Sequence, residues 1–123
     1  MKWLSLIVGG VAGTLARYVM AGAVNRVAGA QFPYGTLAVN VSGCFAIGFF
    51  LSLAEDKFLL GPNARALLMI GFCGAFTTFS TFILETHHLI RDGETLRAFT
   101  NVVASVIIGF VVFRAGIALG RLL

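Results

Sequence analysis

Four long apolar stretches divide the chain, and short segments rich in charged residues, glycine and proline separate them. The stretches cover residues 3–24, 35–54, 64–89 and 97–120. A helix needs about 20 apolar residues to cross a hydrocarbon layer of ~30 Å. A lone strand cannot satisfy its backbone hydrogen bonds in that layer. The pattern therefore predicts an all-α membrane protein with four transmembrane helices in one domain, residues 1–123.

The polar gaps between these stretches are short, so successive helices should run back and forth with both termini on one side. The gap at residues 55–63 includes Pro62 and Asn63, and Asn63 is a candidate N-cap for the third helix. Asp92 or Thr95 is expected to start the fourth helix. No gap is long enough to hold a soluble domain.

The composition agrees with a membrane protein and excludes other classes. Hydrophobic residues make up 59% of the chain, charged residues 11%, and the mean hydropathy is +0.95. A soluble protein carries about 25% charged residues, so a soluble enzyme and a disordered chain are both excluded. The sequence has no phosphate-binding glycine loop, no nucleophile with a base partner and no zinc-ligand spacing. The net charge of +4 fits basic membrane flanks and not a nucleic-acid partner.

The basic residues are divided almost evenly between the two sides of the predicted membrane. Five lie on the side of the termini and four on the other: Lys2, Lys57, Arg65, Arg114 and Arg121 against Arg17, Arg26, Arg91 and Arg97. Because orientation follows the side with more Lys and Arg, a difference of one charge sets it weakly. Either context fixes one orientation, or copies insert both ways and pair as an antiparallel homodimer.

Small residues recur at spacings that allow close helix packing. Gly9 with Gly13, and Gly116 with Gly120, stand four residues apart. In lipid such pairs let helix backbones approach each other. The contact could join two copies of the chain or two helices of one chain, and the spacing does not decide between them.

The third apolar stretch contains the densest group of polar residues inside a predicted span. Residues 71–85 read GFCGAFTTFSTFILE, and four hydroxyls fall within five positions: Thr77, Thr78, Ser80 and Thr81. Such hydroxyls can bond to the i−4 carbonyl and bend a membrane helix, while Gly71 and Gly74 lower helix propensity. Either the helix is unbroken and its hydroxyls are satisfied locally, or it breaks near its middle. Carbonyls freed by a break could hold a cation.

Two phenylalanines, Phe79 and Phe82, alternate with these hydroxyls. Phenylalanines in a membrane helix usually face lipid or pack against a neighbouring helix. The edge of an aromatic ring is electropositive, so a ring edge beside a hydroxyl could solvate a small anion without trapping it at a fixed positive charge. The alternation with hydroxyls favours a pore lining.

Polar residues in the other spans are further candidates. Asn40 is costly at mid-helix unless it faces another helix or water, so it is either glue between helices or a donor to a passing anion. Ser105 lies one turn after Asn101 and could extend a hydrogen-bonding track. Arg17 either snorkels to the interface or draws anions to a pore mouth. Glu85 ends the third span as a cap, an ion-pair partner or a pore exit.

Three blocks of sequence carry a resemblance to a known family. They are GGVAGTLARY at 9–18, GTLAVNVSGCFAIG at 35–48 and GFCGAFTTFSTFILE at 71–85. With them, nearly the whole chain resembles the CrcB/Fluc family of bacterial fluoride channels. The resemblance implies passive fluoride export across the cell inner (plasma) membrane, which lowers cytoplasmic fluoride. It also implies a dual-topology antiparallel homodimer in the lipid bilayer, with two fluoride pores and a third helix broken near its middle.

The resemblance also implies roles for individual residues. Phe79 and Phe82 match the phenylalanines that line the pores, Asn40 matches the pore asparagine, and Arg17 matches the vestibule arginine. The family's polar track and the end of its motif match four further residues: Thr78, Ser80, Thr81 and Glu85.

A central sodium ion is implied as well. In the family it is a structural ion at the dimer centre, and the carbonyls of Gly74 and Thr77 from both subunits would hold it. The fourth helix departs from the family pattern. The family often has a large polar residue near Asn101 and more hydroxyls beyond Ser105, whereas Gly109 offers none.

The main alternative is a small multidrug-type proton-coupled exporter, which also has four spans. Such an exporter needs a membrane-embedded carboxylate. No Asp or Glu lies in the first three-quarters of any span, and the first span carries Arg17 instead. A third possibility, a subunit that does not transport, leaves the alternating phenylalanines and hydroxyls without a role. Cys44 and Cys73 lie inside spans and should behave as small apolar residues.

Overall fold

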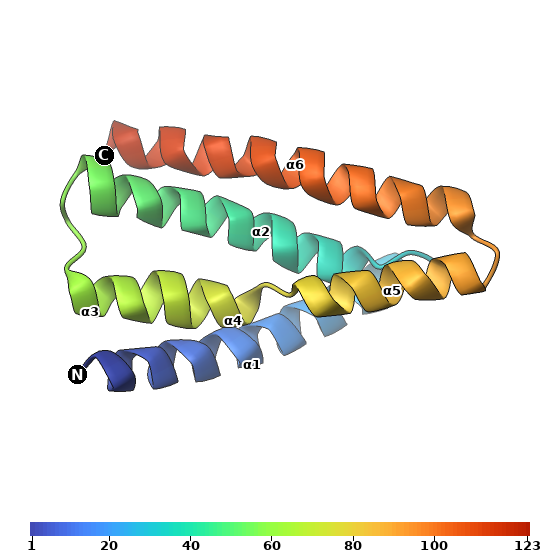
Figure 1. Cartoon of the computed structure of the whole chain (residues 1–123), viewed down its shortest axis with the longest axis horizontal. Coiled ribbons are helices and arrows are strands. Elements are labelled where there is room, and N and C mark those ends of the chain that lie inside the picture. Colours follow the sequence, from blue (N-terminus) through green and yellow to red (C-terminus); the bar gives the residue numbers. More distant parts are fainter.

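The computed structural model describes all 123 residues and consists of helices joined by short connections (Figure 1). In chain order the elements are α1 (Lys2–Ala28), α2 (Tyr34–Leu51), η1 (Ser52–Asp56), α3 (Pro62–Arg65), η2 (Ala66–Cys73), α4 (Gly74–Phe76), α5 (Phe79–Arg91) and α6 (Thr95–Leu122). The segments η1 and η2 are π-helical and continue the α-helices before them. No β-strand is present.

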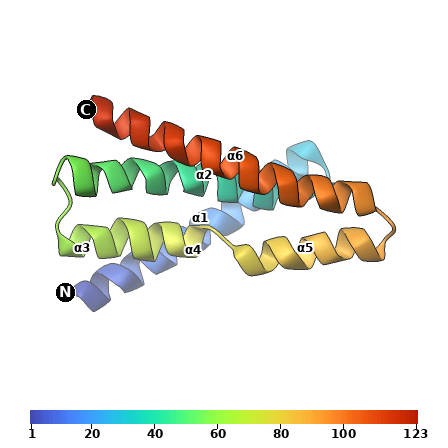
Figure 2. The same ribbon diagram turned by 45° about the horizontal axis from the view of Figure 1, so that its top comes forward.

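These elements form four lengths of helix that are long and apolar enough to cross a membrane. They are Lys2–Ala28, Tyr34–Asp56, Pro62–Arg91 and Thr95–Leu122. Both termini lie at the same end of the molecule (Figure 1). In the turned view of Figure 2, α1 runs obliquely behind the other helices. The prediction of an all-helical protein with four long apolar helices is confirmed.

Glycines bring two pairs of helices to backbone contact. A Cβ on Gly48 of α2 would collide with the backbone carbonyl of Phe113 in α6, and Gly116 of α6 meets the α2 backbone in the same way. Gly9 and Gly13 of α1 lie equally close to the backbone of η2. Small residues at such contacts are typical of helix association in lipid. The close approach of these glycines therefore occurs within one chain.

The start of the third helix differs from the sequence prediction, and the start of the fourth agrees with it. Pro62 occupies the first position of α3 and a glycine precedes it, so Asn63 is not the N-cap. Proline suits this position because the N–H that it lacks would have no helical partner there. The fourth helix begins at Thr95, one of its two predicted starting residues, and Glu94 before it makes no side-chain capping hydrogen bond.

The chain buries few apolar side chains within itself. The buried ones are Val39, Ala54, Ala66, Cys73, Phe76 and Ala98. Many large apolar side chains along α1 and α6 are exposed instead, Leu15 and Phe110 among them. An apolar outer surface is what a lipid environment favours, because lipid tails are as apolar as the side chains that meet them. The polar residues inside the bundle stand out against this background.

Candidate functional site

The backbone between α4 and α5 leaves the helical conformation for two residues. Thr77 has φ −87° and ψ 158°, and Thr78 has φ −148° and ψ 119°, so both are extended. The N–H and the hydroxyl of Thr77 both donate to the Cys73 carbonyl, at 3.1 and 2.9 Å. The N–H of Thr78 does not donate to the Gly74 carbonyl, as it would in a continuous helix. We call Thr77 and Thr78 the junction.

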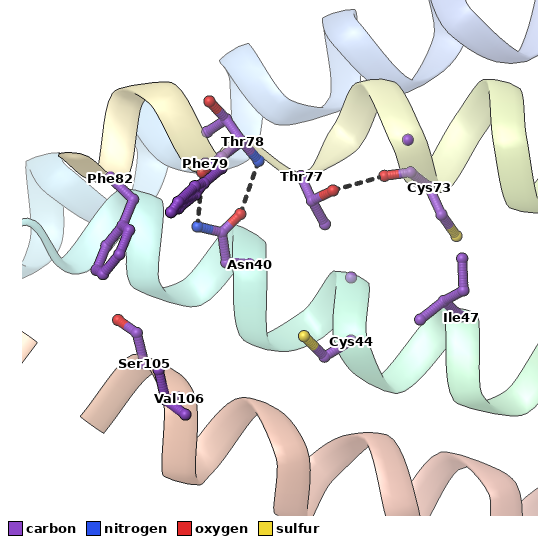
Figure 3. Close-up of a pocket in the computed structure, with 12 residues that line it drawn as sticks. Asn40, Cys44, Ile47, Cys73, Thr77, Thr78, Phe79, Phe82, Ser105 and Val106 are labelled. Atoms are coloured by element: carbon purple, nitrogen blue, oxygen red, sulfur yellow. Dashed lines mark hydrogen bonds between the residues drawn. The ribbon is translucent and has the colours of Figure 1, made fainter. Parts of the chain in front are cut away.

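Asn40 of α2 pairs with the backbone of the junction. Its Oδ1 accepts a hydrogen bond from the Thr78 N–H at 2.8 Å, and its Nδ2 donates to the Thr78 carbonyl at 3.0 Å (Figure 3). Leaving one buried backbone group unpaired would cost about 1–3 kcal/mol. The Asn40 amide thus serves as glue between α2 and the junction. Its nitrogen carries a second N–H, which remains available to a ligand.

The Thr78 side chain caps α5. Its Oγ1 accepts a hydrogen bond from the Thr81 N–H at 3.2 Å and donates to the Thr81 hydroxyl oxygen at 3.0 Å. Threonine is a favoured N-cap residue because its oxygen pairs an otherwise orphan helix N–H. Since the Thr81 oxygen acts as the acceptor in this pair, the proton of the Thr81 hydroxyl is left for another partner.

Phe79 and Phe82 line a cavity of about 430 Å³, which we call the phenylalanine cavity. Its wall also includes Asn40, Cys44, Thr78 and Ser105 (Figure 3). The two ring centroids are 5.8 Å apart and the ring planes are tilted by 43°. The phenylalanine cavity is open on the side of Phe79, which is 63% exposed.

Two of the predicted polar residues lie away from this cavity. Asn101 is buried and donates its Nδ2 to the Thr86 hydroxyl at 2.9 Å, so it does not join Ser105 on the cavity wall. Ser80 is exposed and is absent from the wall of the phenylalanine cavity. Ser105 is therefore the α6 hydroxyl of the predicted track that lines this cavity.

Arg17 lines a second cavity, of about 660 Å³, which we call the arginine cavity. Its polar wall comprises Thr14, Arg17, Asn25, Arg26, Thr36, Thr78, Thr81 and Glu85. The Arg17 Nε donates to the Ala75 carbonyl at 3.0 Å, two residues before the junction. This contact holds the guanidinium against the bundle and leaves its terminal N–H groups for a ligand in the cavity.

A third cavity, of about 510 Å³, is lined by residues of the α1–α2 and α5–α6 connections, and we call it the outer cavity. The α5–α6 connection lies at the end of the molecule opposite the termini (Figure 1). Its polar wall comprises Asn25, Gln31, Glu85, His88, Arg91, Asp92, Glu94 and Arg97. Glu85 also lines the arginine cavity. Its Oε1 is fully buried and accepts no hydrogen bond, and its carboxylate makes no ion pair.

Two backbone carbonyls, that of Gly74 in α4 and that of Thr77 in the junction, suit a hard cation. The Gly74 carbonyl lacks its helical partner because the Thr78 N–H bonds to Asn40, and the Thr81 N–H bonds to the Thr78 hydroxyl and not to the Thr77 carbonyl. Hard cations take oxygen ligands. A Cβ on Gly74 would meet nothing within 4 Å, so the space beside it is open. No three His, Cys, Asp or Glu side chains are grouped to hold a metal.

These features define a class of protein. Four membrane-length helices enclose cavities lined by hydroxyls, amides, phenylalanine rings and two arginines. Polar residues at membrane depth are expensive and mark paths for ions or substrates. The fold and the site therefore define a multi-pass membrane protein built for transport.

The family follows from comparison with known proteins. The model of the family described as CrcB-like protein, Camphor Resistance (CrcB), matches residues 4–117. The chain belongs to this family.

Curated relatives match over nearly the whole chain. A fluoride-specific ion channel FluC from Desulforapulum autotrophicum is 44% identical over 122 residues, which cover 99% of this chain and 98% of the relative. The protein of the same name from Solidesulfovibrio magneticus is 48% identical over 114 residues, covering 93% and 91%. The one from Chlorobaculum tepidum is 49% identical over 114 residues, covering 93% and 90%.

Thr14 and Asn25 line these cavities and are among the wall residues that were not predicted from the sequence. Thr14 stands one turn before Arg17, and this spacing places both on one helix face. That signal was available in the sequence. Asn25 follows the first predicted span and belongs to the last turns of α1 in the structure. Its role depends on Gly35, ten residues later, whose N–H donates to its Oδ1 at 2.9 Å. No local pattern indicates such a contact.

Proposed function

We propose that this protein is a fluoride-specific ion channel through which fluoride leaves the cytoplasm passively. The observation that carries the proposal is the family match over residues 4–117, joined to full-length relatives named as fluoride-specific ion channels. The protein is a multi-pass bacterial membrane protein and an ion channel, not an enzyme.

The path of the ion passes the phenylalanine cavity and the arginine cavity. The edges of Phe79 and Phe82 and the hydroxyl of Ser105 supply electropositive contacts in the first. The free hydroxyl proton of Thr81 supplies one in the second. Thr78 lines both cavities and so connects them. The exposed Ser80 completes the hydroxyl track only where a second copy faces it.

The chemistry of this lining suits fluoride. Fluoride is a small, strongly hydrated ion and a hard hydrogen-bond acceptor, so it needs donors that replace its water at close range. Neutral hydroxyl and amide N–H groups and aromatic edges provide them without a fixed charge that would hold the ion. The second N–H of Asn40 adds one such donor beside the junction.

Arg17 and Glu85 act at the entrance to the path. A cation in a vestibule raises the local concentration of anions, and Arg17 is held for that task by its bond to the Ala75 carbonyl. Glu85 lies on the wall of the same cavity with the opposite charge. Arg17 therefore attracts the anion, and the opposite charge of Glu85 prevents it from being held there.

The working channel is an antiparallel, dual-topology homodimer with two pores. Support comes from the 63% exposure of Phe79, which leaves the phenylalanine cavity open to a second copy. The almost even division of nine basic residues between the two sides allows insertion both ways.

The third membrane span is interrupted at the junction, and a structural sodium ion at the dimer centre binds there. The extended backbone of Thr77 and Thr78 supports the interruption. The carbonyls of Gly74 and Thr77 from each copy would hold the ion, because neither is used within the chain. A bound cation would lock the two copies together and compensate the dipoles of the carbonyls that face it.

Fluoride efflux from liposomes tests the proposed function. Purified protein is reconstituted into liposomes loaded with potassium fluoride, and a fluoride electrode records release after a potassium ionophore is added. We expect rapid release that depends on protein, and no release of chloride from matched liposomes. Release that requires a proton gradient, or no release from folded protein, would refute the proposal.

A further inference from the structure

Asn25 at the end of α1 caps the start of α2. Its Oδ1 accepts the Gly35 N–H at 2.9 Å, and Gly35 is buried against it so tightly that a Cβ there would lie 2.7 Å from Oδ1. Of the two polar atoms of the Asn25 amide, only the oxygen can accept an N–H, so this hydrogen bond fixes the orientation of the amide. The Asn25 Nδ2 donates to no group of the chain. Its N–H groups are therefore available beside the two cavities that Asn25 lines.

Asn25 shares this position with Glu85. These two residues are the ones that line both the outer cavity and the arginine cavity, so together they form the boundary between them. Glu85 brings a carboxylate whose Oε1 is buried without a partner. Asn25 thus has N–H donors that no group of the chain accepts, and Glu85 has an oxygen that accepts no hydrogen bond.

None of the charged groups around the boundary forms an ion pair with Glu85. On the outer side, Arg91 pairs with Asp92 at 3.2 Å and Arg97 pairs with Glu94 at 3.6 Å. His88 is the remaining titratable group of that wall. On the inner side, two cations without ion pairs line the arginine cavity: Arg17 and Arg26. An anion that moves inward leaves paired charges, passes Glu85 and then meets cations.

We infer that Asn25 and Glu85 form a passage between the outer cavity and the arginine cavity, and that the summed charge of this pair sets the rate of fluoride entry from that end. The inference rests on the proposed fluoride conduction. The carboxylate of Glu85 opposes the anion, and the Nδ2 donors of Asn25 offset that opposition. Asn25 is on this account a rate-determining residue of the channel as well as a helix cap.

Exchange of charge between the two positions tests the inference. Asn25→Asp keeps an oxygen for the Gly35 N–H, so the cap of α2 survives, but it replaces the donors by a second negative charge. Glu85→Gln removes the existing charge. The double variant restores a single negative charge at the boundary. Initial rates of fluoride release are measured for all three, with each protein first shown to be folded by its elution profile and thermal midpoint.

The expected rates follow the charge of the pair. One unit charge near an anion in a water-filled cavity changes the rate by about fourfold. We expect Glu85→Gln to be about fourfold faster than wild type and Asn25→Asp about fourfold slower, with the double variant close to wild type. High concentrations of an impermeant salt should shrink all of these differences, because screening shortens the reach of the charges. A purely structural defect would not respond to salt.

The control is Glu55→Gln, which removes an exposed carboxylate that makes no ion pair and lines none of the three cavities. Its rate should match wild type. Equal rates for Asn25→Asp and Glu85→Gln, or a double variant slower than both, would overturn the inference. If Glu85→Gln yields no folded protein, an unchanged rate for Asn25→Asp overturns it alone. A wild-type protein without fluoride flux would instead refute the proposed function.

Discussion

Backbone hydrogen bonds are made in opposite ways in two regions of the molecule. One region is the contact between α2 and α6, and the other is the junction between α4 and α5. α6 runs unbroken through 28 residues, and Gly48 and Gly116 let its backbone touch α2 with no polar side chain involved. At the junction the backbone leaves the helix, and Asn40 and the Thr78 hydroxyl take over its hydrogen bonds. Inside a membrane, a chain can leave the helix only where such partners are supplied. The same partners bring polar groups to the cavities.

The largest expected effect comes from filling the space that the α2–α6 contact requires. Gly48→Ala would drive a methyl group into the Phe113 carbonyl, and we expect a loss of about 3 kcal/mol in the free energy of unfolding. The matched control is Gly22→Ala on α1, where a Cβ meets nothing within 4 Å. Unfolding in detergent by chemical denaturant measures both. Equal stability of the two variants would contradict the packing described for α2 and α6.

The next effect comes from removing a single donor at the junction. Asn40→Asp still accepts the Thr78 N–H but turns a carboxylate oxygen toward the Thr78 carbonyl. We expect a loss of about 2 kcal/mol in stability, because an acceptor there replaces a donor. Fluoride flux should fall by at least about tenfold. Asn101→Asp is the matched control, because Asn101 is also an amide inside a membrane-length helix but bonds to Thr86 away from the phenylalanine cavity.

The outcome for Asn40 and Asn101 separates two roles of an amide inside a helix bundle. Folded Asn101→Asp protein should keep its fluoride flux even where its stability falls. Similar flux from both variants, relative to wild type, would remove Asn40 from the ion path.

A smaller effect is expected from the ring edges. Phe82→Ile keeps an apolar side chain on the wall of the phenylalanine cavity but removes the electropositive edge. We expect fluoride flux to fall by roughly fivefold to tenfold with little change in stability, because aromatic edge contacts contribute about 0.5–1.5 kcal/mol. Phe99→Ile on the exposed face of α6 is the control and should conduct as wild type. Wild-type flux through Phe82→Ile would show that the ring does not contact the ion.

The smallest effect concerns the cap of α5. Thr78→Val keeps the shape of the side chain but loses the oxygen that accepts the Thr81 N–H. We expect a loss of about 1 kcal/mol in the free energy of unfolding. Thr78→Ser keeps the oxygen and should stay close to wild type. If the two variants unfold alike, the hydroxyl is not what starts α5 at Phe79.

The sequence predicts the long elements of this fold well because the signal for them is collective. Four apolar stretches of membrane length are set by many residues each, and the structure has four such helices. Signals that rest on a single residue, such as a helix cap, predict the structure less well. Asn63 carries the right side chain for a cap, but Pro62 occupies the first helical position and Gly61 is the N-cap, two residues before Asn63. The preference of asparagine for the N-cap position is thus overridden by the preference of the neighbouring proline for the first helical position.

The contacts of the candidate site depend on which helices meet, and a single stretch of sequence does not contain that information. Asn40 could be recognised as a residue that needs a partner, because an amide in lipid demands one. That its partner is the backbone of Thr78 follows from the arrangement of α2 beside the junction. Asn25 gives no such signal, because a polar residue in a gap between helices is ordinary. Its importance comes from Gly35 and Glu85, which the fold brings to it.

The reversal potential of the current under a fluoride gradient opposed by chloride tests the central claim most directly. Purified protein is placed in a planar bilayer with fluoride on one side and an equal concentration of chloride on the other. We predict a current that reverses only at a large potential of the sign set by fluoride, because the cavities solvate the smaller ion. A reversal near zero would mean that both anions pass equally, and it would contradict a fluoride-specific channel.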